Sequence, residues 1–231
     1  MRTLLFLDER VSASDVWWEA GALIRRHPVA MLLPAAFLGM LIEIPYLLPD
    51  SEYIIQGLLA FLIQAFAFYF YVAYAEEIMI EARRAEHIPL RSVLTRFLHV
   101  APAVPLVTIA SVAAVIVPGA AASLLVIPGL WLLTRWSLFV PAIVRERLGP
   151  LAALRRSNEL VRGHFELVFL TATFAVILEE SVLSLGALVG FLVSNSDTWG
   201  EWAGGSVAVI LILPLASLAT ALAYGSLSPH S

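Results

Sequence analysis

The sequence predicts an all-α integral membrane protein with six transmembrane helices and three amphipathic helices at the cytoplasmic surface. Hydrophobic residues make up 60% of the 231 residues and charged residues only 14%, compared with about 45–50% and about 25% in a soluble domain. The mean hydropathy is +0.88, so lipid rather than water must surround most of the chain. The basic residues, all of them Arg, lie mainly in short segments between long apolar runs.

The first unit begins with a predicted surface helix over residues 15–26, with Ser14 as its N-cap. Apolar side chains recur on one side of this segment at helical spacing. Its two tryptophans, together with Arg25 and Arg26, are typical of a helix that lies in the headgroup region. The apolar run 29–48 then has the roughly 20 residues that a transmembrane helix requires.

The second unit starts after a second predicted span over residues 53–80. Residues 89–99 have the clearest amphipathic pattern in the chain and are predicted to form the second surface helix. Residues 101–144 must then hold two spans. We place the turn near Pro118-Gly119 and expect Pro128-Gly129 to kink the fourth span, although a turn at Pro128-Gly129 is an open alternative.

The third unit begins with the cytoplasmic segment 145–162, whose helix is expected to start after Gly149-Pro150. The fifth span is predicted over residues 165–193. A polar turn at 195–201 separates it from the sixth span at 203–224.

The distribution of arginines predicts the orientation in the membrane. The loops after the first, third and fifth spans contain no Arg. All arginines except Arg135 lie in the N-terminal segment, in residues 83–96 or in residues 145–162. Because cytoplasmic loops carry an excess of Lys and Arg, we expect both termini and all three amphipathic helices to be cytoplasmic.

The whole chain, residues 1–231, is interpreted as one membrane domain made of three similar units. Each unit has an amphipathic helix, a span, an outer turn and a second span, and the units cover roughly residues 14–82, 88–145 and 150–225. The first and third units also match at several positions with a constant offset. An internal repeat and chance similarity between apolar segments both explain these matches, and both stay open.

The predicted spans contain four charged residues that could form an intramembrane cluster: Arg135, Glu43, Glu179 and Glu180. An Arg at the bilayer centre costs at least about 2.5–3.5 kcal/mol on insertion scales. We therefore expect Arg135 to face the helix bundle and to contact a carboxylate, Glu180 in preference to Glu43. Such a pair could fix helix packing or line a path for a substrate or protons; alternatively, Arg135 could reach an aqueous vestibule.

Other polar residues are interpreted as lying at the membrane boundary. Glu76 and Glu77 are close to arginines in the sequence, so we expect them to be solvated or paired at the surface. His27, His99 and His164 each follow a predicted surface helix. Since none has a metal-ligand partner at i+3 or i+4, they are predicted to be interfacial anchors.

Basic side chains on the three surface helices are the predicted contacts with lipid headgroups. They are Arg25, Arg26, Arg91, Arg96, Arg155, Arg156 and Arg162. The sequence contains no phosphate-binding glycine loop, no HExxH and no GxSxG motif. We therefore expect no catalytic centre, no cofactor and no metal site.

One segment also carries a family resemblance. The matching residues are Pro128-Gly129, Arg135, Pro141, Glu146, Gly149-Pro150, Ala153-Leu154, Arg156-Ser157, Leu160 and Gly163. In these positions, residues 128–165 resemble the membrane-domain family associated with glycerophosphoryl diester phosphodiesterases and related six-span bacterial proteins. The resemblance implies a bacterial cytoplasmic-membrane protein with an anchoring or accessory role. It does not imply the phosphodiesterase activity, which belongs to a separate catalytic domain.

The leading functional hypothesis is a non-enzymatic multi-pass membrane protein that acts as a scaffold, associates with lipid or assists a partner. The alternative is a small oligomeric transporter or channel that uses Arg135 with Glu180 or Glu43. A lipid-processing membrane enzyme is the third hypothesis. The expected partners are membrane lipids and either a second copy of the chain or a partner membrane protein, and no nucleic acid.

Overall fold

The structure is a computed structural model that describes residues 11–42, 44–47, 53–84, 88–100, 126–194 and 197–228. Every element in these residues is a helix. Three stretches of them are long and apolar enough to cross a membrane: Ile127–Glu146, Phe165–Ser194 and Trp202–Leu227. The described residues therefore confirm an all-helical fold with three helical stretches that could span a membrane. The number of six spans stays a prediction, and residues 101–125, assigned to the third and fourth spans, lie outside the described residues.

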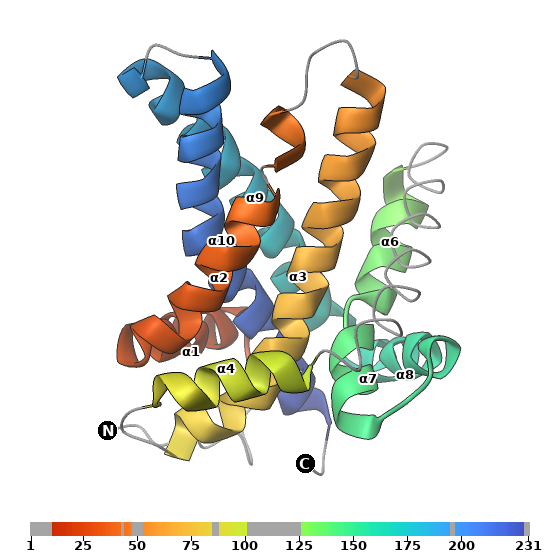
Figure 1. The fold of residues 1–231 in the computed structure, drawn as a ribbon. Helices are drawn as coiled ribbons and strands as arrows, with labels where there is room; N and C mark the ends of the chain where they lie inside the picture. Colours follow the sequence, from red (N-terminus) through yellow and green to blue (C-terminus); the bar gives the residue numbers. More distant parts are fainter. Residues whose placement is uncertain are drawn as a thin grey trace.

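The long helices run side by side along the molecule (Figure 1). They are α2 (Pro28–Ile42), α3 (Tyr53–Arg84), α9 (Phe165–Ser194) and α10 (Asp197–Leu227), and the short helix η1 (Ile44–Leu47) follows α2. Helix α10 packs against α9, α2 and α3 and also contacts α1 (Ala13–Arg26). It is therefore the central element of the bundle.

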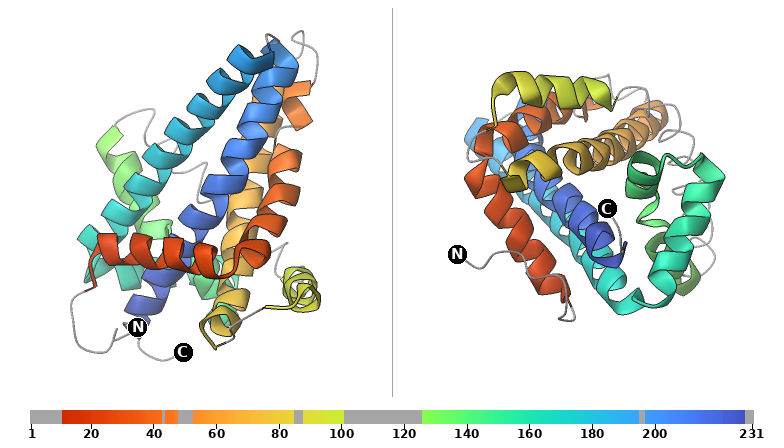
Figure 2. Two further views of the ribbon diagram at one scale, coloured as in Figure 1. Left: turned by 90° about the vertical axis from the view of Figure 1, so that its left-hand side faces the viewer. Right: turned by 90° about the horizontal axis from the view of Figure 1, so that it is seen from below.

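The three predicted amphipathic segments are helices that lie crosswise at one end of the bundle. They are α1, α4 (Leu90–His99) and α8 (Pro150–Arg162). Figure 2 shows them arranged around the ends of the long helices. Helix α1 begins two residues earlier than predicted, because Ser12 rather than Ser14 is the N-cap and exchanges hydrogen bonds with Asp15. Their location in a membrane interface and the internal repeat stay predictions.

A proline inside α2 determines how α2 packs on α3. Pro34 has no N–H, so the carbonyl of Ala30 has no donor within the helix. The Tyr74 hydroxyl donates to this carbonyl over 2.7 Å, and Tyr71 donates to the neighbouring carbonyl of Met31 over 2.5 Å. Both tyrosines are buried. They satisfy backbone groups that a membrane interior could not hydrate.

The predicted fourth span is broken into α6 (Val126–Trp136) and α7 (Phe139–Glu146). The alternative turn at Pro128-Gly129 is wrong, since both residues lie within α6, while the preferred turn near Pro118-Gly119 lies outside the described residues. The break is at residues 137–138 instead. In a continuous helix, the ring of Pro141 would clash with the carbonyl of Ser137 and would leave that carbonyl without a donor. Pro141 instead occupies the first turn of α7, where no intrahelical N–H bond is needed.

Glycines allow the backbones of α9 and α10 to approach each other closely. Gly186 and Gly190 on α9 face Gly204 and Gly200 on α10, which gives each helix a small residue every fourth position. A Cβ atom at Gly186 would lie 2.6 Å from the carbonyl oxygen of Gly204. The contact between the antiparallel helices α9 and α10 is the most extensive helix–helix contact among the described residues. It follows the small-xxx-small pattern of membrane helices.

Candidate functional site

The break between α6 and α7 is held together by a side chain from α8. Ser157 is fully buried. Its hydroxyl accepts a hydrogen bond from the Leu138 N–H at 3.1 Å and donates one to the Arg135 carbonyl at 2.8 Å. One hydroxyl thus satisfies a donor and an acceptor that the interrupted helix leaves free.

Arg135 lies at this junction, and its side-chain partners among the described residues are on α8 and α6. Its Nη1 donates to Asn158 Oδ1 on α8 at 2.9 Å, and its guanidinium carbon lies 4.0 Å from the centroid of the Trp131 ring. Glu180 is exposed on α9, and within the described residues no ion pair joins it to Arg135. Glu43 lies outside the described residues. The preference for Glu180 was wrong because the break places Arg135 against the polar surface helix α8.

Replacing Ser157 by alanine is expected to lower the free energy of unfolding by about 1–3 kcal/mol, because it leaves two buried backbone groups unsatisfied. The measurement is an SDS titration of the purified protein in mixed micelles, followed by circular dichroism. Ser184→Ala is the matched control, since Ser184 is exposed on α9. Equal effects of the two substitutions would contradict the bridging role of Ser157.

A second cluster, the inner charge cluster, joins α3, α7, α8 and α10 and consists of Glu76, Arg145, Glu146, Arg156 and Tyr224. Arg145 forms an ion pair with Glu76 and lies 5.6 Å from the Tyr224 ring. Arg156 Nε donates to both oxygens of Glu146 at 2.9 and 3.0 Å. The Tyr224 hydroxyl donates to Glu146 Oε1 at 2.6 Å. The hydrogen bond with Glu146 raises the pKa of Arg156, so this arginine stays charged.

The prediction for Glu76 was wrong, since its side chain has 0% exposure. Sequence proximity pointed to arginines of the same loop, whereas the true partner, Arg145, is 69 positions away. Glu77 does pair near the surface, with Arg96 Nη1 at 3.2 Å.

His27 is also buried, and its Nε2 donates to the Ala82 carbonyl at 2.9 Å. Its assignment as an interfacial anchor was therefore wrong, while His99 and His164 are exposed.

Of the two acidic residues predicted within the fifth span, Glu179 accepts a hydrogen bond from another helix and Glu180 is exposed. Gln64 on α3 donates to Glu179 Oε1 on α9 at 3.2 Å, a hydrogen bond across a helix interface. The described residues therefore place Arg135 and the acids of α9 in separate environments rather than in one cluster.

The seven predicted headgroup arginines divide into two groups. Arg96 pairs with Glu77 and, at 3.6 Å, with Glu81, and Arg156 pairs with Glu146. The other five are exposed and form no ion pair within the described part of the chain. These free arginines are Arg25, Arg26, Arg91, Arg155 and Arg162.

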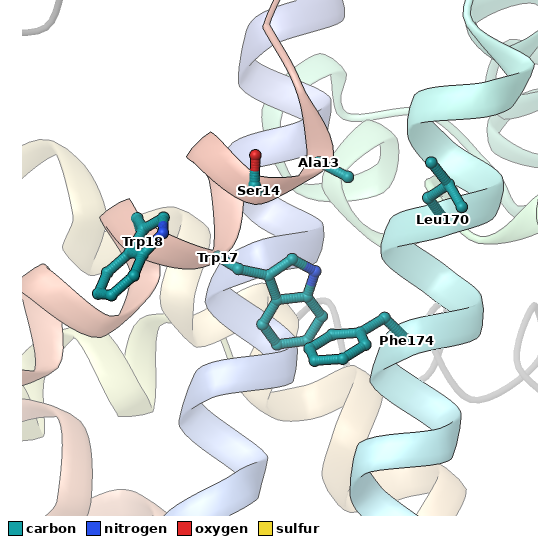
Figure 3. Close-up of a pocket in the computed structure, with 6 residues that line it drawn as sticks. All are labelled: Ala13, Ser14, Trp17, Trp18, Leu170 and Phe174. Carbon is teal, nitrogen blue, oxygen red and sulfur yellow. The ribbon is translucent and has the colours of Figure 1, made fainter.

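An apolar groove lies between α1 and α9 (Figure 3). It encloses about 410 Å³ and is lined by Ala13, Ser14, Trp17, Trp18, Leu170 and Phe174. The Trp17 and Phe174 rings meet edge to face with centroids 4.8 Å apart. The Trp17 Nε1 atom is buried and has no hydrogen-bond partner in the described residues, an arrangement that costs about 1–3 kcal/mol.

The sequence analysis placed both tryptophans in the headgroup region but missed this groove. The hydrophobic pattern of α1 does not predict that it packs against α9, which is far away in the sequence.

Among the described residues, no group of His, Asp or Glu is arranged to hold a metal ion. No family model, curated protein or solved structure matches the chain.

Proposed function

We propose that this chain is a non-enzymatic, multi-pass scaffold of a bacterial cytoplasmic membrane that binds anionic lipid headgroups with its cytoplasmic face. The observation that carries the proposal is the position of the five free arginines. They belong to α1, α4 and α8, which lie at the same end of the bundle (Figure 1). At about 1 kcal/mol for each Arg near an anionic surface, they supply a binding free energy of up to about 5 kcal/mol.

The inner charge cluster supports a scaffold in a different way. It ties α8 to α7 and α10 through Glu146, Arg156 and Tyr224, and it ties α7 to α3 through Arg145 and Glu76. Headgroups bound to α8 are therefore linked mechanically to the bundle. Arg135, the residue on which a transport path would depend, is instead held by Asn158 and Trp131.

Changing all five free arginines to glutamine is expected to abolish stabilisation by anionic lipid. The thermal midpoint of unfolding is measured in nanodiscs of phosphatidylcholine with and without phosphatidylglycerol. Anionic lipid should raise the midpoint of the wild type, with an effect that weakens as salt is added. The glutamine variant should have the same midpoint in both lipids.

The variant with lysine at all five positions is the matched control and should keep the response to phosphatidylglycerol. An undiminished response of the glutamine variant would overturn headgroup binding by these residues. An ion or solute flux into proteoliposomes that Arg135→Gln abolishes would favour a transporter instead.

A further inference from the structure

The groove between α1 and α9 has a mostly apolar lining, in which the Trp17 indole nitrogen is buried and has no hydrogen-bond partner among the described residues. Trp17, Trp18, Leu170 and Phe174 contribute apolar surface. Figure 3 shows the indole nitrogen of Trp17 on the side of its ring that faces Ala13 and Leu170. This nitrogen is a hydrogen-bond donor only. A ligand that fills the groove and satisfies the site must therefore combine a hydrocarbon with one accepting oxygen.

The groove borders the apolar outer side of α9 at Leu170 and Phe174. Leu170, Phe174 and Ile177 follow each other on one side of this helix and are 47%, 47% and 59% exposed. Of the residues of α9, Val168, Thr171 and Ala175 are buried, and the side that carries Leu170, Phe174 and Ile177 faces outward. In a bilayer, the surroundings of such a surface are lipid acyl chains. A lipid chain packed along this side of α9 would meet the groove at Leu170 and Phe174.

We propose that the groove holds one acyl chain of a membrane glycerolipid, with the Trp17 indole N–H donating to the ester carbonyl oxygen of that lipid. The proposal rests on the lipid association proposed above, but it concerns the chain and the ester rather than the headgroup charge. The volume of about 410 Å³ lies within the range of about 300–1,000 Å³ that small-molecule sites occupy. The ester group lies just below the headgroups, the depth at which interfacial tryptophans are found.

The test uses zwitterionic dioleoyl phosphatidylcholine, so that headgroup charge has no part in it. Native mass spectrometry measures how much of this lipid the purified protein retains in detergent. The wild type should retain one molecule. Its diether analogue, which has no ester carbonyl, should bind about fivefold to tenfold more weakly, as expected for the loss of one hydrogen bond.

Two variants locate the site. Trp17→Phe keeps an aromatic ring but removes the N–H, so it should bind the ester and ether lipids equally. Leu170→Trp fills the groove and should reduce retention at least tenfold. Leu185→Trp is the matched control, since Leu185 is 60% exposed elsewhere on α9, and it should retain lipid as the wild type does.

Equal binding of ester and ether lipids by the wild type would overturn the role of Trp17, even if a variant failed to fold. Unchanged retention by Leu170→Trp would overturn the groove as the site. A dimer without bound lipid would identify a second copy of the chain as the occupant. Each of these results leaves the response of the free arginines to phosphatidylglycerol intact, so the two proposals can fail separately.

Discussion

Replacing Gly186 by alanine is expected to lower the free energy of unfolding by about 2–3 kcal/mol, since the new methyl group overpacks a tight interface. Its Cβ would lie 2.6 Å from the carbonyl oxygen of Gly204 and 2.7 Å from the Cβ of Ala208. Both atoms belong to the opposite helix, so α9 and α10 would have to separate. Gly200→Ala should act similarly, because its Cβ would lie 2.5 Å from the Gly190 carbonyl oxygen. SDS titration of the folded protein measures the loss.

Helix propensity alone would predict the opposite change in the free energy of unfolding for Gly186→Ala. Alanine is favoured over glycine in a helix interior by about 1 kcal/mol, so an isolated α9 would become more stable. The control is Gly163→Ala, where a Cβ meets no atom within 4 Å, and which should change the free energy by no more than about 0.5 kcal/mol. A Gly186→Ala protein as stable as the wild type would contradict the close approach of the two backbones.

The positions of the helices were largely predictable because they depend on local patterns. The fifth span was expected at residues 165–193 and α9 covers Phe165–Ser194. The surface helix expected at 89–99 is α4, Leu90–His99. In both cases, the pattern of apolar residues predicted the helix, and flanking proline or polar residues marked its ends to within a few residues.

The partners of the polar residues were not predictable because they come from distant elements. Arg135 was assigned to a carboxylate on grounds of charge, but the break caused by Pro141 brings Asn158 to it. Glu76 was assigned to nearby arginines, whereas its partner Arg145 is on α7, 69 positions away. The break itself had a signal in the sequence, but a single proline does not say whether a helix bends or stops.

Replacing Glu76 by glutamine is expected to have the largest effect on stability, a loss of about 3–5 kcal/mol. The ion pair with Arg145 is buried, with 0% exposure of the Glu76 side chain and 15% of the Arg145 side chain. Removing the carboxylate takes away the opposite charge of a buried ion pair, and breaking such a pair typically costs about 3–5 kcal/mol. Glu77→Gln is the matched control one residue along α3, since the Glu77–Arg96 pair is 23% and 41% exposed, and it should cost about 0–1 kcal/mol.

The double variant Glu76→Gln, Arg145→Met separates the ion pair from the other contacts of these residues. If the cost of each single variant comes from an uncompensated charge, removing both charges should be less destabilising than removing either one. Additive losses would mean that the two residues act through different neighbours. The cycle thereby decides whether charge or packing holds α7 against α3. Because Arg156 of α8 bonds to Glu146 of α7, the same result decides how α8 is anchored to the bundle.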